Sequence, residues 1–226
     1  MAATIRTDKI GPVSGSADFT LPTSDGSAKS ALITNGSKVL SFATGTPSAS
    51  NFLRGDGTWA AVGGGKVLQV VQSTKKDTDS SSSSGTSFVD IAGTDQAAAG
   101  SVWCVKITPA ATSSKILCTY TITCGTSGSA TVQLRLVRDS TDVFLAASPS
   151  SRVDTSSIAG VPHNDAMQSS SMAYLDSPSS TSELTYKVQW AAISGHTVYC
   201  NRSLTDTDSA SYQRSASSIT VVEIGV

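Results

Sequence analysis

Ile116-Leu-Cys118-Thr-Tyr120-Thr-Ile122-Thr-Cys124 is the stretch that decides the fold, because a large apolar or sulfur-bearing side chain occupies every second position. Side chains two positions apart lie on the same face of a β-strand. One face of this stretch therefore carries the isoleucines, the tyrosine and both cysteines, whereas the other carries mostly threonine. The pattern predicts a strand that buries one face in a core.

The same alternation recurs along the C-terminal two thirds of the chain. It places Leu184, Tyr186, Val188 and Trp190 on one face, and a shorter version runs through residues 132–136. The predicted strands are 67–72, 87–91, 102–108, 115–123, 130–138, 143–146, 172–175, 184–191, 197–201 and 218–224. No stretch has a convincing helical period, and short strands at this spacing are typical of a sandwich or barrel. We therefore expect an all-β fold, in which residues 67–226 form an antiparallel, jelly-roll-like β-sandwich.

Two of these strands are ambiguous, because residues 67–71 and 221–224 have apolar side chains on both faces. Such strands either lie in the centre of a sheet that is covered twice or contact another subunit. The serine run 80–84 has no hydrophobic side chain and is expected to be a flexible loop. The longest predicted loops, at which binding residues tend to lie, are 76–86, 147–170 and 202–216.

Composition excludes several classes of function. The 226 residues carry 16 Lys and Arg against 17 Asp and Glu, so the basic surface of a nucleic-acid-binding protein is not expected. No apolar run is long enough for membrane insertion. The N-terminus does not resemble a secretory signal, so we expect synthesis in the cytosol and four free cysteines.

The N-terminal third has a different texture. In Phe52-Leu-Arg-Gly55-Asp-Gly57-Thr-Trp59-Ala, two glycines allow a tight turn between large hydrophobic side chains. The surrounding Ser, Thr and Gly cannot cover these side chains, so we expect Phe42, Phe52, Leu53 and Trp59 to pack against copies of themselves. Residues 1–22 are predicted to be an attachment segment, and residues 23–66 a thin shaft that ends in a glycine hinge.

Several sequence motifs in this N-terminal third also resemble the N-terminal and shaft segments of tail-fibre-type structural proteins of tailed bacteriophages. The similarity lies in Asp18-Phe-Thr-Leu-Pro22, Ala31-Leu-Ile-Thr-Asn-Gly36 and Ser48-Ala-Ser-Asn51 followed by FLRGDGTWA, and more weakly in residues 174–178, 185–189 and 217–221. The resemblance implies a virion protein, a homotrimer whose residues 1–22 dock on another virion protein. It also implies that the C-terminal tip adheres to a glycan of the host cell surface.

Glycan sites commonly combine an aromatic platform with polar loop residues. Tyr174, Tyr212, Arg214 and Arg152 lie in or near predicted loops and are the candidate receptor-binding residues. The alternative function is a head or tail decoration fibre that binds other virion proteins and recognises no receptor.

Other motifs give no sign of chemistry. Arg54-Gly55-Asp56 is better explained by the turn than by integrin binding, and Gly63-Gly-Gly-Lys66 lacks both ends of a phosphate loop. His163 and His196 have no second ligand at a suitable spacing. Asp206-Thr-Asp208 and Asp77-Thr-Asp79 lack the glycine and glutamate of a calcium loop. We therefore expect no metal, no cofactor and no enzymatic activity.

Overall fold

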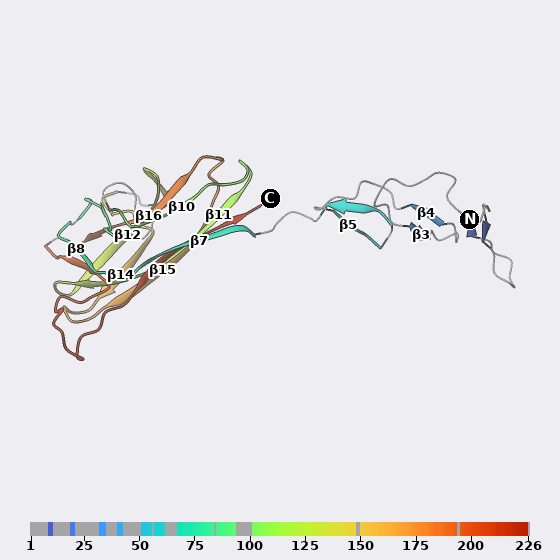
Figure 1. The fold of residues 1–226 in the computed structure, drawn as a ribbon. Coiled ribbons are helices and arrows are strands. Elements are labelled where there is room, and N and C mark those ends of the chain that lie inside the picture. Colours follow the sequence, from blue (N-terminus) through green and yellow to red (C-terminus); the bar gives the residue numbers. More distant parts are fainter. Residues whose placement is uncertain are drawn as a thin grey trace. The chain divides into compact units, whose positions relative to one another are not determined.

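The computed structural model describes residues 51–55, 57–61, 67–83, 85–93, 101–147, 150–193 and 195–225, together with the backbone of four short strands nearer the N-terminus. The chain divides into two compact units, Met1–Gly64 and Gly65–Val226. Every regular element among the described residues is a β-strand, and all the paired strands are antiparallel (Figure 1). The predicted all-β, antiparallel fold is confirmed. No helix in the described part is long and apolar enough to cross a membrane.

The described strands of the first unit form two-stranded hairpins. They pair β1 (Lys9–Ile10) with β2 (Phe19–Thr20), β3 (Leu32–Thr34) with β4 (Leu40–Phe42), and β5 (Asn51–Leu53) with β6 (Trp59–Ala61). In the last hairpin the predicted turn is formed: the Arg54 amide donates to the Thr58 carbonyl at 2.8 Å, and Gly57 takes a φ of 80°.

The side chains predicted to pack in a shaft are only partly covered by their own chain. Phe52 is 49% exposed and Leu53 38% exposed, whereas Trp59 is half-buried. The side chain of Phe42 lies outside the described residues.

The second unit contains two six-stranded sheets. The β12 sheet consists of β9 (Val89–Asp90), β10 (Cys104–Ile107), β12 (Ala130–Arg138), β13 (Thr141–Phe144), β14 (Ser157–Val161) and β16 (Leu184–Ala192). The β11 sheet consists of β7 (Val67–Lys75), β8 (Asp79–Ser81), β11 (Lys115–Thr126), β15 (Gln168–Asp176), β17 (Val198–Cys200) and β18 (Ser217–Ile224). β12 and β16 form the centre of the first sheet, and β11 and β18 that of the second.

The core lies between the two sheets and is filled by the alternating side chains. The inner face of β11 buries Ile116, Cys118, Tyr120, Ile122 and Cys124, each no more than 2% exposed. The β12 sheet contributes Val132, Leu134, Leu136, Leu184, Tyr186, Val188 and Trp190 to the same cluster. The faces predicted from period-two alternation are therefore confirmed, and the arrangement is that of a β-sandwich.

A buried polar contact also joins the two sheets. Asp176, at the end of β15, is 5% exposed. Its Oδ2 accepts hydrogen bonds from the Tyr186 hydroxyl at 2.7 Å and from Arg138 at 2.5 Å, both of which belong to the β12 sheet. Its other oxygen accepts the Ser177 amide. Asp176 is thus a cross-sheet tie.

Two predicted loops contain strands. β8 occupies the start of the serine run and pairs with β17, so the prediction of a loop over 80–84 is wrong for Ser80 and Ser81. Backbone hydrogen bonds hold this strand although its side chains bring no hydrophobic burial. The loop predicted over 147–170 contains β14 and the first residues of β15.

Candidate functional site

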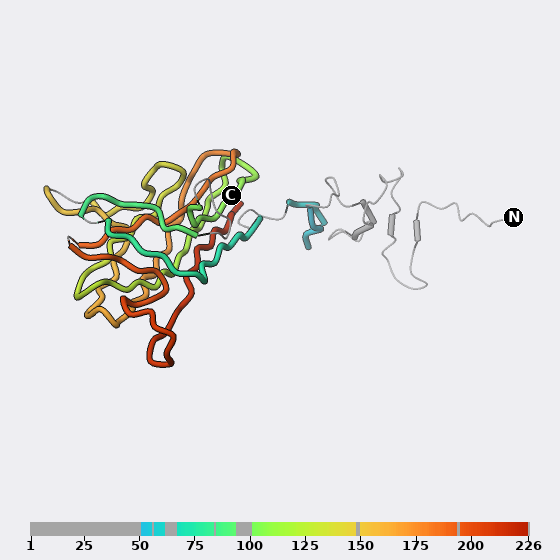
Figure 2. Tube along the Cα trace, turned by 60° about the vertical axis from the view of Figure 1, so that its left-hand side comes forward, coloured from blue at the N-terminus to red at the C-terminus, as the bar shows by residue number. Residues whose placement is uncertain are grey.

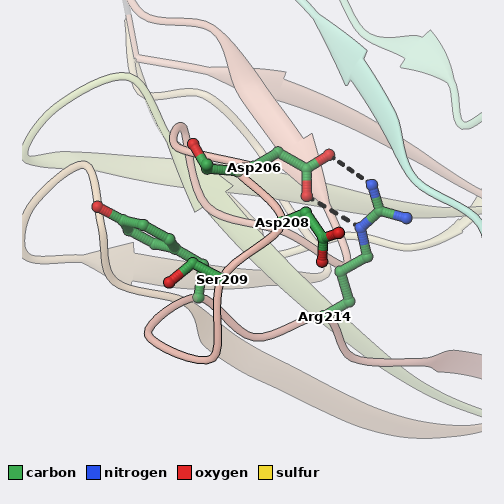
Figure 3. Close-up of a pocket in the computed structure, with 6 residues that line it drawn as sticks. Asp206, Asp208, Ser209 and Arg214 are labelled. Carbon is green, nitrogen blue, oxygen red and sulfur yellow. Dashed lines mark hydrogen bonds and ion pairs between the residues drawn. The ribbon is translucent and has the colours of Figure 1, made fainter.

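A pocket lies in the loop between β17 and β18. It is lined by Asp206, Thr207, Asp208, Ser209, Tyr212 and Arg214 (Figure 3). The loop extends from the body of the second unit, and its colour in Figure 2 is orange-red. All six lining residues are exposed. A ligand could therefore reach them directly from solvent.

An ion pair shapes one side of this pocket. The Nε of Arg214 donates to Oδ1 of Asp206 at 2.9 Å, and its Nη2 donates to Oδ2 at 2.8 Å (Figure 3). The hydrogen bond to Arg214 lowers the pKa of Asp206, and the hydrogen bond to Asp206 raises the pKa of Arg214. Two parallel hydrogen bonds fix the plane of the guanidinium as well as its position.

Buried polar contacts hold the base of the loop closed. Asn201, just before the loop, is fully buried, and its Nδ2 donates to the carbonyls of Lys75 and Asp77, both at 2.9 Å. Its Oδ1 accepts the hydroxyl of Ser217 at 2.6 Å, on the far side of the loop. The Ser215 amide closes the ring by donating to the Asn201 carbonyl at 3.1 Å. The loop therefore projects from a fixed base.

A second loop supports the first. The Leu204 amide donates to the Asn164 carbonyl at 2.9 Å, and the Thr205 hydroxyl donates to Asp165 at the same distance. These contacts come from the segment between β14 and β15. Two of the three loops predicted to carry binding residues thus lie side by side.

Tyr212 supplies the aromatic part of the pocket. Tyr212 is 37% exposed, and its amide donates to the Ser209 carbonyl at 3.0 Å, which makes a turn within the loop. An exposed ring offers an apolar face to the C–H groups of a sugar, while carboxylates and hydroxyls beside it accept and donate hydrogen bonds. The arrangement can bind a polar, hydroxyl-rich ligand.

The pocket unites two of the four candidate receptor-binding residues. Tyr212 and Arg214 line it, whereas Arg152 lies in the exposed segment before β14 and is not among the lining residues. Tyr174 lies within β15 rather than in a loop: it is half-buried against the core and stacks on Phe144 with ring centroids 4.8 Å apart.

Asp206 and Asp208 are site residues that the sequence analysis did not predict, because their motif lacks the glycine and glutamate of a calcium loop. A signal did exist, since Arg214 follows Asp206 by eight residues within one loop. The other aspartate pair has structural contacts: Asp77 pairs with Lys75, and Asp79 accepts the amides of Ser80 and Ala92. Within the described residues, no three His, Cys, Asp or Glu side chains are placed to hold a metal ion.

Comparison with known proteins adds no assignment to this geometry. No protein-family model matches the chain, and no curated protein matches it.

Proposed function

We propose that the chain is a structural protein of a tailed-phage virion, a homotrimeric tail fibre whose second unit adheres to a glycan of the host cell surface. Residues 1–22 would dock on another virion protein. The proposal assigns binding, not catalysis, to the loop pocket.

The observation that carries this proposal is the pocket at the tip of the β17–β18 loop. It combines an exposed tyrosine ring, a fixed guanidinium–carboxylate pair and hydroxyl groups in one open hollow. Sugar sites use this mixture, because a pyranose presents an apolar C–H face and a ring of hydroxyls.

The hairpin of β5 and β6 supports the trimeric part of the proposal. Phe52 and Leu53 remain 49% and 38% exposed. Covering such side chains stabilises an assembly by ~25 cal/mol per Å² of apolar surface. Copies of the same hairpin around an axis would provide that cover.

The test is binding of the full chain to host cells and to an array of bacterial surface polysaccharides. Tyr212→Ala removes the ring, and Arg214→Gln breaks both hydrogen bonds to Asp206. We expect each change to weaken binding by about tenfold, equivalent to ~1.4 kcal/mol. Arg152→Gln is the matched control, because it removes an exposed guanidinium outside the pocket.

Equal binding by all three variants would remove the pocket from the proposal. A chain that assembles into virions but binds neither cells nor polysaccharides would favour the alternative, a head or tail decoration fibre. Locating the protein on the particle by cryo-electron microscopy separates these two functions directly.

A further inference from the structure

The outer face of the β11 sheet has an unusual composition. We call it the hydroxyl face and define it by the outward positions of β7, β11, β15 and β18. These are Val67, Val70, Gln72, Thr74, Lys115, Leu117, Thr119, Thr121, Thr123, Ser169, Ser171, Ala173, Leu175, Ser218, Thr220, Val222 and Ile224. Lys115 is the single charged residue among them.

The residues of this face lie in rows across the four strands. Register places Leu175 opposite Leu117, Leu117 opposite Val222, and Val222 opposite Val70. The two ends of this apolar row are open to solvent, since Leu175 is 50% and Val70 is 60% exposed. A continuous apolar row on an outer face is a feature of surfaces that bind another protein.

The rows beside it are made of hydroxyl and amide groups. Thr121 and Ser171 are hydrogen-bonded at 2.8 Å, as are Thr123 and Ser169. Side chains tied to a cross-strand neighbour lose little further conformational entropy when another surface covers them. The hydroxyl-bearing rows of this face are therefore uncharged and already ordered.

The outer face of the β12 sheet is a useful comparison within the same molecule. On this face each central strand forms an ion pair with a neighbouring strand. Lys187 of β16 pairs with Asp90 of β9 at 2.8 Å, and Arg135 of β12 pairs with Asp142 of β13 at 3.6 Å. Such charges are typical of a face that remains in water. The two sheets of one sandwich thus have outer surfaces of different kinds.

The pairing of β7 decides between the two explanations of its apolar pattern. Among the described strands β7 pairs with β18 alone, so it is an edge strand and not a central one covered twice. Contact with another subunit is the explanation that remains for Val67 and Val70, which are 61% and 60% exposed.

We infer that the hydroxyl face binds further copies of this chain, three copies turning it toward a common axis. Charge is the argument for a copy over a foreign partner. When the same face of two copies comes together, charges of the same sign face each other and repel. A face that binds its own copy must therefore be close to neutral, as this one is. Hydroxyl groups both donate and accept hydrogen bonds, and identical rows can therefore satisfy each other. The inference rests on the proposed homotrimer and names a surface for it.

Labelling of an introduced thiol tests whether the face is covered. Ala173→Cys places a thiol in the middle of the hydroxyl face, and Gly160→Cys places one on the outer face of the β12 sheet, where an added Cβ has no atom within 4 Å. Both positions are exposed in the single chain. The four native cysteines are buried and contribute little background.

In the purified full chain we expect the thiol at position 173 to react with a maleimide about tenfold more slowly than that at 160, because a covered thiolate is not accessible. In denaturant the two rates should be equal. A trimer in which both positions react equally fast would overturn the inference while leaving the proposed fibre intact. A monomer by light scattering would overturn both.

Two lysine substitutions give an independent readout. Val70→Lys and Ile158→Lys add the same charge at positions 60% and 59% exposed, the first on the hydroxyl face and the second on the β12 sheet. Like charges brought together around an axis oppose assembly. We expect Val70→Lys to raise the concentration at which the assembly dissociates by about tenfold, equivalent to ~1.4 kcal/mol, and Ile158→Lys to leave it unchanged. Equal dissociation of both variants would contradict the inference.

Discussion

At the scale of single residues, burial controls the chemistry of the four cysteines. All four are free, and all are buried. Burial, with a smaller contribution from the charge of Asp176, raises the pKa of Cys118 to about 12. Burial likewise raises the pKa of Cys124, with a further contribution from Cys200. These thiols pack as small hydrophobic side chains rather than as nucleophiles.

We therefore expect the native chain to be inert toward a thiol reagent at pH 8. A neutral thiol buried in a core supplies almost no thiolate. Titration with a chromogenic disulfide should detect no reactive cysteine in the native protein and all four after denaturation. Rapid reaction of any cysteine without unfolding would contradict the described packing.

The Asp176 tie predicts a large effect from a small change. Asp176→Asn leaves Arg138 without its carboxylate and weakens the bond from Tyr186. We expect a loss of about 2 to 3 kcal/mol of unfolding free energy, the usual cost of removing a partner from a buried charged hydrogen bond.

The matched control for this prediction is Asp142→Asn. Asp142 pairs with Arg135 at 3.6 Å, and its side chain is 34% exposed, so about 0.5 kcal/mol is expected. Urea unfolding measures both variants, and similar losses would show that the tie has no special role.

At the scale of elements, the end of β11 lies very close to the chain after β17. A Cβ added to Gly125 would lie 2.4 Å from the backbone oxygen of Arg202. Backbone atoms cannot rotate away as a side chain can, so the strand would have to shift.

Gly125→Ala should therefore destabilise the second unit by about 1 to 3 kcal/mol, the range found for overpacking. Gly160→Ala is the control, because an added Cβ there has open space. Thermal unfolding should show a clearly lower midpoint for Gly125→Ala and almost no change in the midpoint for Gly160→Ala.

The β17–β18 loop has a predictable response to acid. The pKa of Asp206 is lowered in the folded chain from its ordinary value of 3.8 by the hydrogen bond to Arg214. A lowered pKa means that the pairing is fully present above that ordinary value and is lost as the pH falls through the lowered one.

NMR titration of the Asp206 carboxyl should accordingly give a midpoint below 3.8 in the wild-type chain. The midpoint should return toward 3.8 in Arg214→Gln. An unchanged midpoint in this variant would mean that Arg214 does not hold Asp206 in solution.

The elements also show what a sequence can and cannot predict here. Long strands with one buried face, such as β12 and β16, were predicted almost to the residue, because burial imposes the alternation. β8 and β14 were not predicted. Asp79-Ser-Ser in β8 has no hydrophobic side chain, and Gly160 interrupts the pattern of side chains in β14. Their backbone pairing depends on neighbours that are distant in sequence.

The same limit applies to the candidate site. Tyr212 and Arg214 could be proposed because residues 202–216 lack a strand pattern. The inward position of Tyr174 could not be predicted. Tyr174 and Leu175 are both large and adjacent, so alternation alone does not say which one faces the core. Register with β11 decides it: Tyr174 lies opposite the buried Cys118.

At the scale of the whole molecule, the division into Met1–Gly64 and Gly65–Val226 separates the proposed roles. The hydrophobic core cluster lies entirely within the second unit. A fragment of residues 66–226 should therefore unfold cooperatively by itself, because a unit of this size can bury a core of its own.

This fragment should also bind host cells and fail to join virions. Circular dichroism during unfolding checks that the fragment folds by itself. A cell-binding assay checks that it binds host cells, and an assay of incorporation into particles checks that it fails to join virions. Attachment to particles without binding to cells would reverse the proposed polarity of the fibre.

The pairing of β7 with β18 has a consequence for how the second unit is made. These strands are its first and last, and they lie side by side along their length (Figure 1). β11 also needs β18 on one edge. The β11 sheet thus cannot close until the ribosome has synthesised β18, and such distant pairings fold slowly. Until then, the strands of the β11 sheet that are already synthesised lack β18 and can pair wrongly. A short C-terminal deletion should therefore lower the yield of soluble protein more than an N-terminal deletion of equal length.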